Sequence, residues 1–503
     1  MKRILAKNSI FGLGQAVINL IFVFLVIPVF IKMLGSVTYG VFALVMVVGN
    51  LNSFTNLGLT NALVKFIAEQ GRSEKSNIDI FVNLILLIAA ILPLTLVFIY
   101  FNEFILLDLL KIPLKVFDEA KGLFILVLWA NFLLLIGQVF KAILDALQKV
   151  YVTSLVQIFY NFLYWGLILT ALLLGFNLPA IGLAIFIAAL IWLVITIINA
   201  KKVWGKYSAA GFYNNYKNAT KKQLSYGLKI YASGLIGFFY EPLSKILISN
   251  FIGVSEVGFY DIALKLRSQI WGFIAQIFYP LFPFISKEQD KSVIRKYVHD
   301  LEQKSFLIIV PIIVLVILLM HPFISIWIGK DVDIISITAI FIISFHLIGS
   351  SVIPNYQFLM AKNLAQKTII LQLSNVIFNG VFFLITIQFL GYYALIVGNV
   401  AAIVSSFILS LYYQHKYLDS LIFDSSKQII KLLIVGCIMF GIGFMTNTFI
   451  TSNLLRMVLD PMIVIIAAIF LYRSFNMISL EDIKRYSGDS LNLSRLGIKL
   501  FVK

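Results

Sequence analysis

The amino-acid sequence predicts an all-α polytopic membrane protein with about 14 transmembrane helices. Of its 503 residues, 61% are hydrophobic and only 13% are charged, whereas soluble domains carry about 25% charged residues. Apolar runs of roughly 20 residues recur along the chain, and each is long enough to cross about 30 Å of hydrocarbon. These runs lack a two-residue alternation of apolar and polar side chains. Helices are therefore the structure that can pair every backbone polar group inside the bilayer.

The apolar runs define the expected spans in chain order. They cover residues 8–33, 40–64, 79–101, 120–144, 151–174, 180–200, 224–251, 257–285, 304–328, 334–360, 368–390, 392–414, 428–448 and 452–473. The first run follows the basic segment MKRILAKNSIFGLG and is too long for the core of a signal peptide, so we expect it to be retained as the first span.

The distribution of basic residues predicts the orientation in the membrane. Most of the 40 Lys and Arg residues fall in alternate connections, above all in KKVWGKYSAAGFYNNYKNATKK, in KEQDKSVIRKYVHDLEQK and in the tail after Arg473. Basic residues favour the cytoplasmic side, so we place these segments and both termini in the cytoplasm. Topology then accounts for the net charge of +17, and no nucleic-acid partner is expected.

An internal repeat relates spans 1–6 to spans 7–12. The turn MLGSVTYGVFAL (33–44) resembles FIGVSEVGFYDI (251–262), and ALQKVYVTSLVQ (146–157) resembles AKNLAQKTIILQ (361–372). Both halves begin on the same side, so the repeat is parallel. We expect two six-helix lobes, residues 1–213 and 214–420, with an appended helix pair and basic tail at 421–503. Chance similarity of glycine-containing turns is the alternative.

Polar side chains recur at helical spacing on the first two spans and on span 7. They are Gln15, Asn19, Asn50, Ser53, Asn56 and Ser233. Amides in lipid need partners, so such residues either hydrogen-bond between helices or line a hydrated cavity. Our interpretation assigns all six to the lining of a central cavity where the two lobes meet, the usual place for a transporter's substrate.

Charged residues interrupt spans 7 and 8, although each costs about 2.5–3.5 kcal/mol on insertion scales. Glu241–Lys245 and Asp261–Lys265 are acid-before-base pairs four residues apart, the orientation that a helix favours. Mutual neutralisation is one explanation for both pairs. Arg267 has no acidic residue within four positions, so its partner is expected to be another helix or an anionic substrate.

No catalytic residue, cofactor or metal site is predicted. Cys437 is the only cysteine and the four histidines are scattered, which excludes a Cys/His metal cluster. The sequence also lacks a Walker A pattern, a glycine-rich nucleotide loop and an HExxH motif. A transporter, and not an enzyme, is therefore expected.

Two neighbouring segments, LGSVTYGVFALV and FTNLGLTNALVKFIAEQ, resemble the polysaccharide flippases for O-antigen and capsule repeat units. These flippases form a branch of the multidrug/oligosaccharidyl-lipid/polysaccharide exporter superfamily. The matching residues are Leu34, Gly35, Tyr39 and Gly40 of a Leu-Gly-x3-Tyr-Gly turn, then Leu57, Gly58 and Leu59 near the end of the second helix.

The resemblance implies a V-shaped bundle in the bacterial inner membrane. Such a bundle would move undecaprenyl-diphosphate-linked oligosaccharide from the inner to the outer leaflet by alternating access, for surface polysaccharide or lipopolysaccharide assembly. The implied partners are this lipid, the bilayer, and a polysaccharide polymerase with its chain-length machinery. Arg267, Lys245 and Lys265 are the candidate contacts for the anionic diphosphate. Glu241 and Asp261 are candidates for proton coupling, because a partly buried carboxylate can titrate near neutral pH.

Three other functions stay open. A drug or cation exporter of the same superfamily would share the fold, but such exporters commonly carry an acidic residue in the first helix, where this chain has Gln15 and Asn19. A peptidoglycan-precursor flippase is a close relative. A polysaccharide polymerase or ligase usually has a long outer loop with reactive side chains, whereas the outer connections here are short and mostly apolar.

Overall fold

The computed structural model describes residues 2–477, except for 50–55, 209–210, 279–280, 282–284, 286–287, 351, 363, 420–425 and 476. Side chains are described from residue 18 onward, with gaps that include 229–230 and 232–238. Structural statements below refer to this part of the chain.

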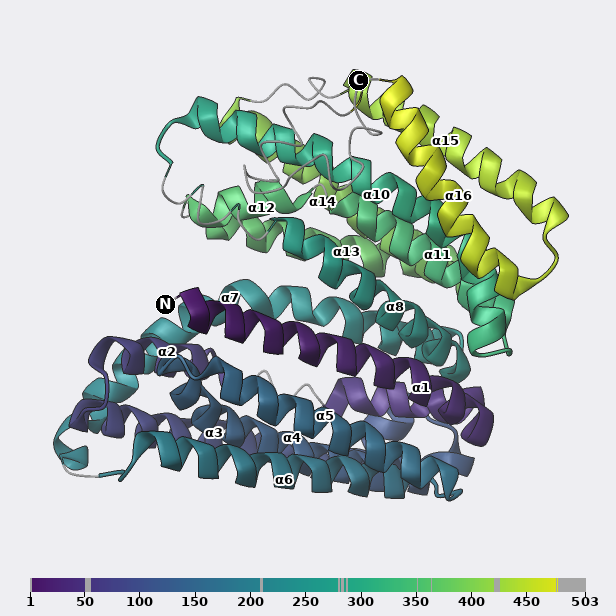
Figure 1. The fold of residues 1–503 in the computed structure, drawn as a ribbon. Coiled ribbons are helices and arrows are strands. Elements are labelled where there is room, and N and C mark those ends of the chain that lie inside the picture. The colour runs from purple at the N-terminus through teal and green to yellow at the C-terminus, as the bar shows by residue number, and fades with distance from the viewer. Residues whose placement is uncertain are drawn as a thin grey trace. The chain divides into compact units, whose positions relative to one another are not determined.

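The described chain is a succession of helices (Figure 1). The long ones are α1 (Lys2–Gly49), α2 (Leu59–Gln70), α3 (Glu74–Tyr100), α4 (Phe117–Ala146), α5 (Val150–Leu173), α6 (Leu178–Trp204), α7 (Phe212–Phe251), α8 (Val254–Phe278), α10 (Lys291–Trp327), α11 (Val332–Gly349), α12 (Val352–Ala361), α13 (Ala365–Leu390), α14 (Ala394–Leu418), α15 (Ser426–Phe449) and α16 (Asn453–Ser474). Short helices are η2 (Phe104–Leu109), η3 (Leu114–Val116) and η4 (Gly391–Tyr393).

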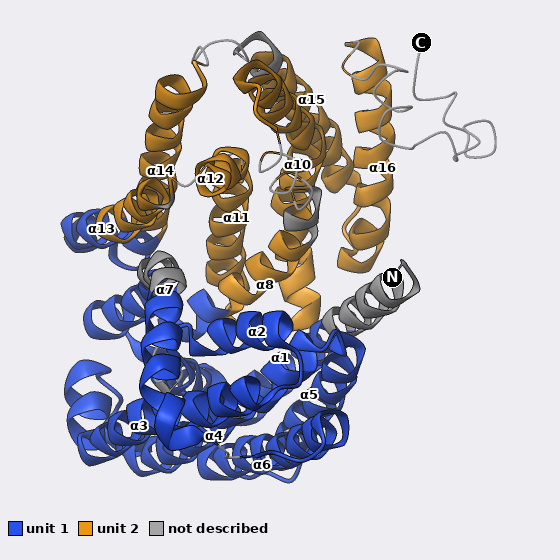
Figure 2. Ribbon diagram, turned by 90° about the vertical axis from the view of Figure 1, so that its left-hand side faces the viewer, with its two compact units in different colours: residues 1–261, 379–395 blue, residues 262–378, 396–503 orange. Residues whose placement is uncertain are grey.

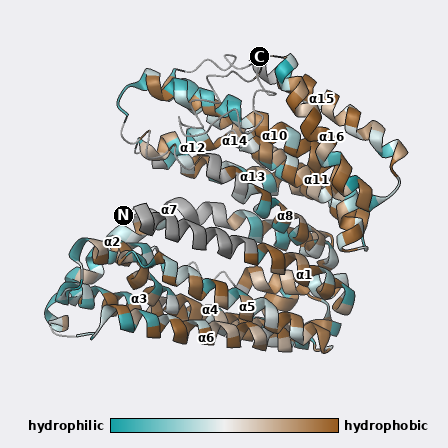
Figure 3. Ribbon diagram, viewed as in Figure 1, coloured by the Kyte–Doolittle hydropathy of each residue, from teal (hydrophilic) through white to brown (hydrophobic). Residues whose placement is uncertain are grey.

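The predicted class, an all-α polytopic membrane protein, is confirmed. Ten segments among the described residues are long and apolar enough to cross a membrane, so the predicted count of fourteen is not confirmed. Apolar residues dominate the length of most of these helices (Figure 3). Large apolar side chains such as Phe389 and Phe449 are exposed, which suits a surface that faces lipid.

Two predicted spans are not single helices. The span expected at 40–64 begins inside α1, which continues past a kink at Gly35, and a new helix starts at Leu59. Leu57 and Gly58, directly before it, both have positive φ. The span expected at 334–360 divides into α11 and α12. Hydropathy measures apolar content and does not register these backbone breaks.

The structure contains two compact units (Figure 2). Unit 1 comprises residues 1–261 and 379–395, and unit 2 comprises residues 262–378 and 396–503. The boundaries fall inside α8, α13 and α14. The lobes inferred from the repeat, 1–213 and 214–420, stay a prediction.

Unit 1 is built around α4. Helices α4 and α6 pack along much of their length, α5 packs on α1 and α6, and α2, α3 and α7 close the other side. One hydrophobic core among its described residues joins apolar side chains of α2, α3 and α4. In unit 2, α10 packs on α11 and on the antiparallel pair α15–α16.

Candidate functional site

Four side chains of unit 1 form a buried charge cluster between α1, α7 and α8. The Nζ of Lys245 lies 2.6 Å from Asp261 Oδ1 and 3.1 Å from Glu241 Oε1. The hydroxyl of Tyr39 donates to Asp261 Oδ2 at 2.7 Å. We call Tyr39, Glu241, Lys245 and Asp261 the charge cluster. The predicted Glu241–Lys245 pair is confirmed, and Lys245 also joins Asp261 from a second helix.

Exposure differs sharply within the charge cluster. The side chains of Lys245 and Asp261 are 2% and 8% exposed, whereas that of Glu241 is 41% exposed. With all three groups ionised, two carboxylates face one ammonium, so the cluster carries one excess negative charge. Pairing offsets part of the desolvation cost of the buried ions, and Glu241 is the accessible end of the cluster.

Small residues bring the helices of the charge cluster together. A Cβ placed on Gly40 would lie 1.8 Å from the backbone oxygen of Val254, and one on Gly258 would lie 3.3 Å from the backbone N of Gly40. Helix α1 and the start of α8 therefore cross at backbone contact, as small residues allow in membranes. The two turns matched in the sequence repeat thus lie against each other, which brings Tyr39 to Asp261.

The other two predicted cations, Lys265 and Arg267, lie further along α8, in unit 2. Both are half-buried. Arg267 interacts electrostatically with His346 of α11, whose ring packs at 4.4 Å on Trp271. The three predicted head-group contacts are thus divided between the two units.

The structure describes some of the residues predicted to line the cavity and not others. Asn19 accepts a hydrogen bond from Trp165 Nε1 at 3.1 Å. Asn56 caps α2 by accepting from the backbone N and hydroxyl of Thr60. Asn50, Ser53 and the side chains of Gln15 and Ser233 lie outside the described residues. A cavity-lining role for these residues stays a prediction.

A small pocket opens beside Asn19 inside unit 1. It has a volume of about 250 Å³ and lies between α1, α4, α5 and α6. Its lining consists of Asn19, Met46, Val127, Asn131, Leu134, Tyr160, Asn161, Tyr164, Trp165 and Ile185. We call it the amide–aromatic pocket. Only Asn19 of this lining was singled out by sequence reasoning, because scattered Tyr, Trp and Asn residues look like ordinary span residues.

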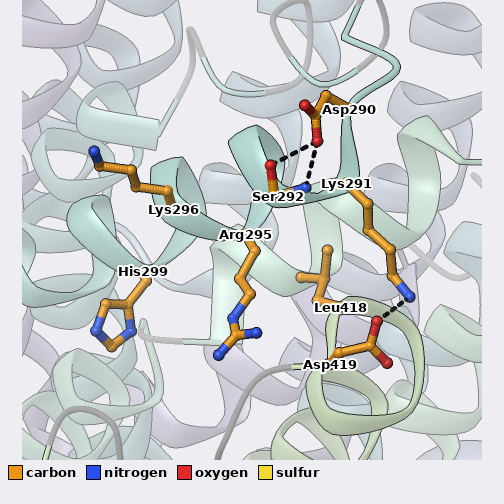
Figure 4. Close-up of a pocket in the computed structure, with 8 residues that line it drawn as sticks. All are labelled: Asp290, Lys291, Ser292, Arg295, Lys296, His299, Leu418 and Asp419. Carbon is orange, nitrogen blue, oxygen red and sulfur yellow. Dashed lines mark hydrogen bonds and ion pairs between the residues drawn. The ribbon is translucent and has the colours of Figure 1, made fainter.

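A second pocket, the basic pocket, lies in unit 2 where α10 begins and α14 ends (Figure 4). Its volume is about 690 Å³, and it is lined by Asp290, Lys291, Ser292, Arg295, Lys296, His299, Leu418 and Asp419. Lys291 reaches Asp419 at 2.6 Å, while Lys296 points away from that pair. The hydrogen bond and charge of Lys291 hold the pKa of the Asp419 carboxyl below its usual value.

Sequence reasoning missed a polar cluster that ties α3 to α7. Asn83 donates to Gln223 Oε1 at 2.7 Å and to the backbone oxygen of Leu59 at 2.8 Å. Gln223 donates to the backbone oxygen of Asp79 at 2.8 Å, and Asp79 also faces Lys222 at 3.7 Å. Asp79 and Asn83 stand one helical turn apart at the start of span 3, which was the available signal.

No group of three His, Cys, Asp or Glu side chains among the described residues is placed to hold a metal ion. The arrangement instead offers a buried ion network, a half-buried guanidinium and a pocket of amides and rings. These groups can bind and release polar ligands and protons.

Comparison with known proteins gives one family match. The model of a family described as "Polysaccharide biosynthesis protein" matches residues 5–289, more than half of the chain. No curated protein sequence matches.

Solved structures are similar in fold at low sequence identity. The lipid II flippase MurJ in an inward closed conformation has a TM-score of 0.71 and 15% identity over 93% of this chain and 99% of its own. An inward-facing multidrug resistance MATE family transporter of the MOP superfamily has a TM-score of 0.59 and 14% identity over 82% of this chain and 99% of its own. The Vibrio cholerae MATE transporter VcmN in the bent form has a TM-score of 0.55 and 14% identity, over 83% of this chain and 98% of its own. The predicted resemblance is confirmed, and the chain has the fold of these proteins.

Proposed function

The chain belongs to the polysaccharide biosynthesis protein family, and we propose that it is a lipid-linked oligosaccharide flippase. It would move undecaprenyl-diphosphate-linked repeat units from the inner to the outer leaflet of the bacterial inner membrane, by alternating access and without catalysing a reaction. One observation carries the proposal. The matched region, residues 5–289, contains the whole charge cluster, in which the side chains of Lys245 and Asp261 are only 2% and 8% exposed.

Three cations have different roles in this proposal. Arg267 and Lys265 attract the diphosphate, and Arg267 is the better suited of the two because a guanidinium can bind phosphate oxygens in pairs. Lys245 is already bonded to two carboxylates. Protonation of the accessible Glu241 would remove one negative charge beside Lys245 and strengthen its attraction for an anion. Proton movement and head-group binding would thus be coupled.

A cation exporter is the second candidate, and a specific observation favours it. The charge cluster has one more carboxylate than ammonium, and Glu241 is 41% exposed. An accessible carboxylate could bind an organic cation or a proton. A peptidoglycan-precursor flippase is the third candidate, since the fold is that of a lipid II flippase.

The deciding experiment uses the cell that produces the glycan. The gene is deleted, and lipid-linked oligosaccharide is measured on each face of the inner membrane with a probe that reaches only the outer leaflet. Accumulation of complete repeat units on the cytoplasmic face, with loss of surface polysaccharide, supports the proposal. Unchanged surface glycan with new sensitivity to cationic compounds supports the exporter, and accumulation of peptidoglycan precursor supports the third candidate.

The residue assignments are tested in the complemented deletion strain. Arg267→Ala and Lys245→Ala should each reduce surface glycan, whereas Lys330→Ala, at an exposed lysine outside the described helices, serves as the matched control. Export at the wild-type level by both Arg267→Ala and Lys245→Ala, with normal protein abundance, would show that these cations do not hold the diphosphate.

A further inference from the structure

The amide–aromatic pocket combines ring faces with carboxamide groups inside a membrane-spanning unit. Three of its side chains, Tyr160, Tyr164 and Trp165, come from two successive turns of α5. The Tyr164 and Trp165 rings meet edge to face at 4.8 Å, and Tyr160 lies 5.7 Å from Tyr164. This packing holds the aromatic wall in place. Three amides also line the pocket: Asn19 from α1, Asn131 from α4 and Asn161 from α5 itself.

The hydrogen bonds described for two of these amides involve their oxygen atoms. Trp165 Nε1 donates to Asn19 Oδ1 at 3.1 Å, and Gln157 Nε2 donates to Asn161 Oδ1 at 3.3 Å. A carboxamide has two N–H donors besides its oxygen. The two bonds therefore orient Asn19 and Asn161 while using none of their N–H donors. Asn161 and Trp165 are also largely buried, at 7% and 9% exposure.

Size and charge limit what the pocket can hold. Its volume of about 250 Å³ is below the roughly 300–1,000 Å³ of sites for drug-sized ligands, so it suits a single ring. No Asp, Glu, Lys, Arg or His is among the described residues that line it. An anionic diphosphate would find no counter-ion there. A neutral ring with hydroxyl groups on its edge and C–H groups on its face would match both amides and aromatic walls.

The pocket also lies next to the charge cluster. Tyr164, on the pocket wall, interacts electrostatically with both Tyr39 and Asp261. A ligand in the pocket would therefore sit close to the side chains that hold Lys245. Both features belong to unit 1 (Figure 2).

We propose that the amide–aromatic pocket binds one uncharged sugar ring of the glycan head group during transport. Asn19 and Asn161 donate hydrogen bonds to ring hydroxyls, and Trp165 stacks on the ring face while the perpendicular ring of Tyr164 holds it in place. The inference deepens the proposed function and rests on it, because it assigns the sugar to unit 1 and leaves the diphosphate to the cations.

The test uses the full chain in lipid nanodiscs and a panel of methyl glycosides of glucose, galactose, N-acetylglucosamine and rhamnose. Saturation-transfer difference NMR detects the weak binding that a single ring gives. At least one glycoside is expected to bind, and Asn161→Ala and Trp165→Phe are each expected to weaken it about tenfold. The matched controls, Asn102→Ala and Trp129→Phe, change residues of unit 1 that do not line the pocket. Both control variants should bind the glycoside as the wild type does.

Folding is controlled within the same experiment. Asn161→Ala keeps every ring of the aromatic wall and removes a proposed hydrogen-bond donor, so it reports on ligand contact even if Trp165→Phe unfolds. Competition with tetraphenylphosphonium separates a sugar site from an aromatic site for cations. The inference would be overturned if no glycoside binds, or if glycoside binding is the same in all pocket variants. Tight binding of tetraphenylphosphonium in place of the glycoside would also overturn it.

The outcome is separable from that of the proposed function. Glycoside binding at the pocket in a chain whose deletion leaves lipid-linked oligosaccharide correctly distributed would contradict the flippase but not the sugar site. Normal flipping by Asn161→Ala and Trp165→Phe, with no glycoside binding by the wild type, would contradict the sugar site but not the flippase.

Discussion

Two ion pairs in this protein have the same N–O distance and opposite surroundings. Lys245–Asp261 in the charge cluster and Lys291–Asp419 in the basic pocket both have an N–O distance of 2.6 Å. The first pair is 2% and 8% exposed, whereas the second is 52% and 71% exposed. Water screens the exposed pair and has been removed from the buried one. The comparison shows that distance alone does not reveal how much a pair contributes.

The largest expected effect is at the buried pair. Lys245→Met keeps the length of the side chain but leaves two carboxylates facing each other, which costs about 3–5 kcal/mol when a buried pair loses one partner. We expect a large drop in the unfolding midpoint in nanodiscs. Lys291→Met is the matched control. A midpoint for Lys245→Met within error of the wild type would mean that burial does not distinguish the two pairs.

The helix crossing that assembles the charge cluster should be the next most sensitive point. Gly40→Ala forces a methyl group onto the backbone oxygen of Val254, and overpacking of this kind costs about 3 kcal/mol at the upper end of its usual range. Gly166→Ala is the control, because a Cβ there meets nothing within 4 Å. Equal stability of the two variants, measured by thermal unfolding, would show that α1 and α8 can separate at no cost.

A smaller effect is expected from the tyrosine of the cluster. Tyr39→Phe removes the hydrogen bond to Asp261 while keeping the ring, and hydrogen bonds to charged groups contribute about 1.5–3 kcal/mol. The exposed Tyr100 provides the control Tyr100→Phe. Unfolding of both variants at the wild-type midpoint would indicate that the Tyr39 hydroxyl does not contribute to stability through Asp261.

The smallest effect is expected at the exposed pair. Lys291→Met should leave the unfolding midpoint at pH 7 unchanged. The pKa of the Asp419 carboxyl is lowered by Lys291 in the folded chain, so the favourable interaction is present above the unfolded pKa of about 3.9 and is lost as the pH falls through the folded value. NMR titration of labelled aspartates should show this pKa rising in Lys291→Met. An unchanged pKa would mean that Lys291 does not interact with Asp419 in solution.

Much of the fold was accessible to sequence reasoning because its rules are local. Apolar runs and the four-residue spacing of Glu241 and Lys245 correctly indicated membrane helices and an ion pair. The spans at 40–64 and 334–360 were wrong as single helices. The break before Leu59 is tied to packing, because a Cβ on Gly58 would lie 2.3 Å from the backbone oxygen of Gly227 on α7. A contact of that kind leaves no trace in hydropathy.

In the candidate sites, too, some features follow from the sequence and others only from the tertiary structure. The sequence by itself determined a helical membrane protein, its family, and which charged residues must find partners, because burial of a charge or a backbone group in lipid has a high energetic cost wherever it occurs. Tertiary structure alone decided that Lys245 bonds to Asp261, that Tyr39 completes the cluster, and that Asn19 meets Trp165 beside a pocket. These partners lie on different helices, and only the crossing of those helices brings their side chains within hydrogen-bonding distance.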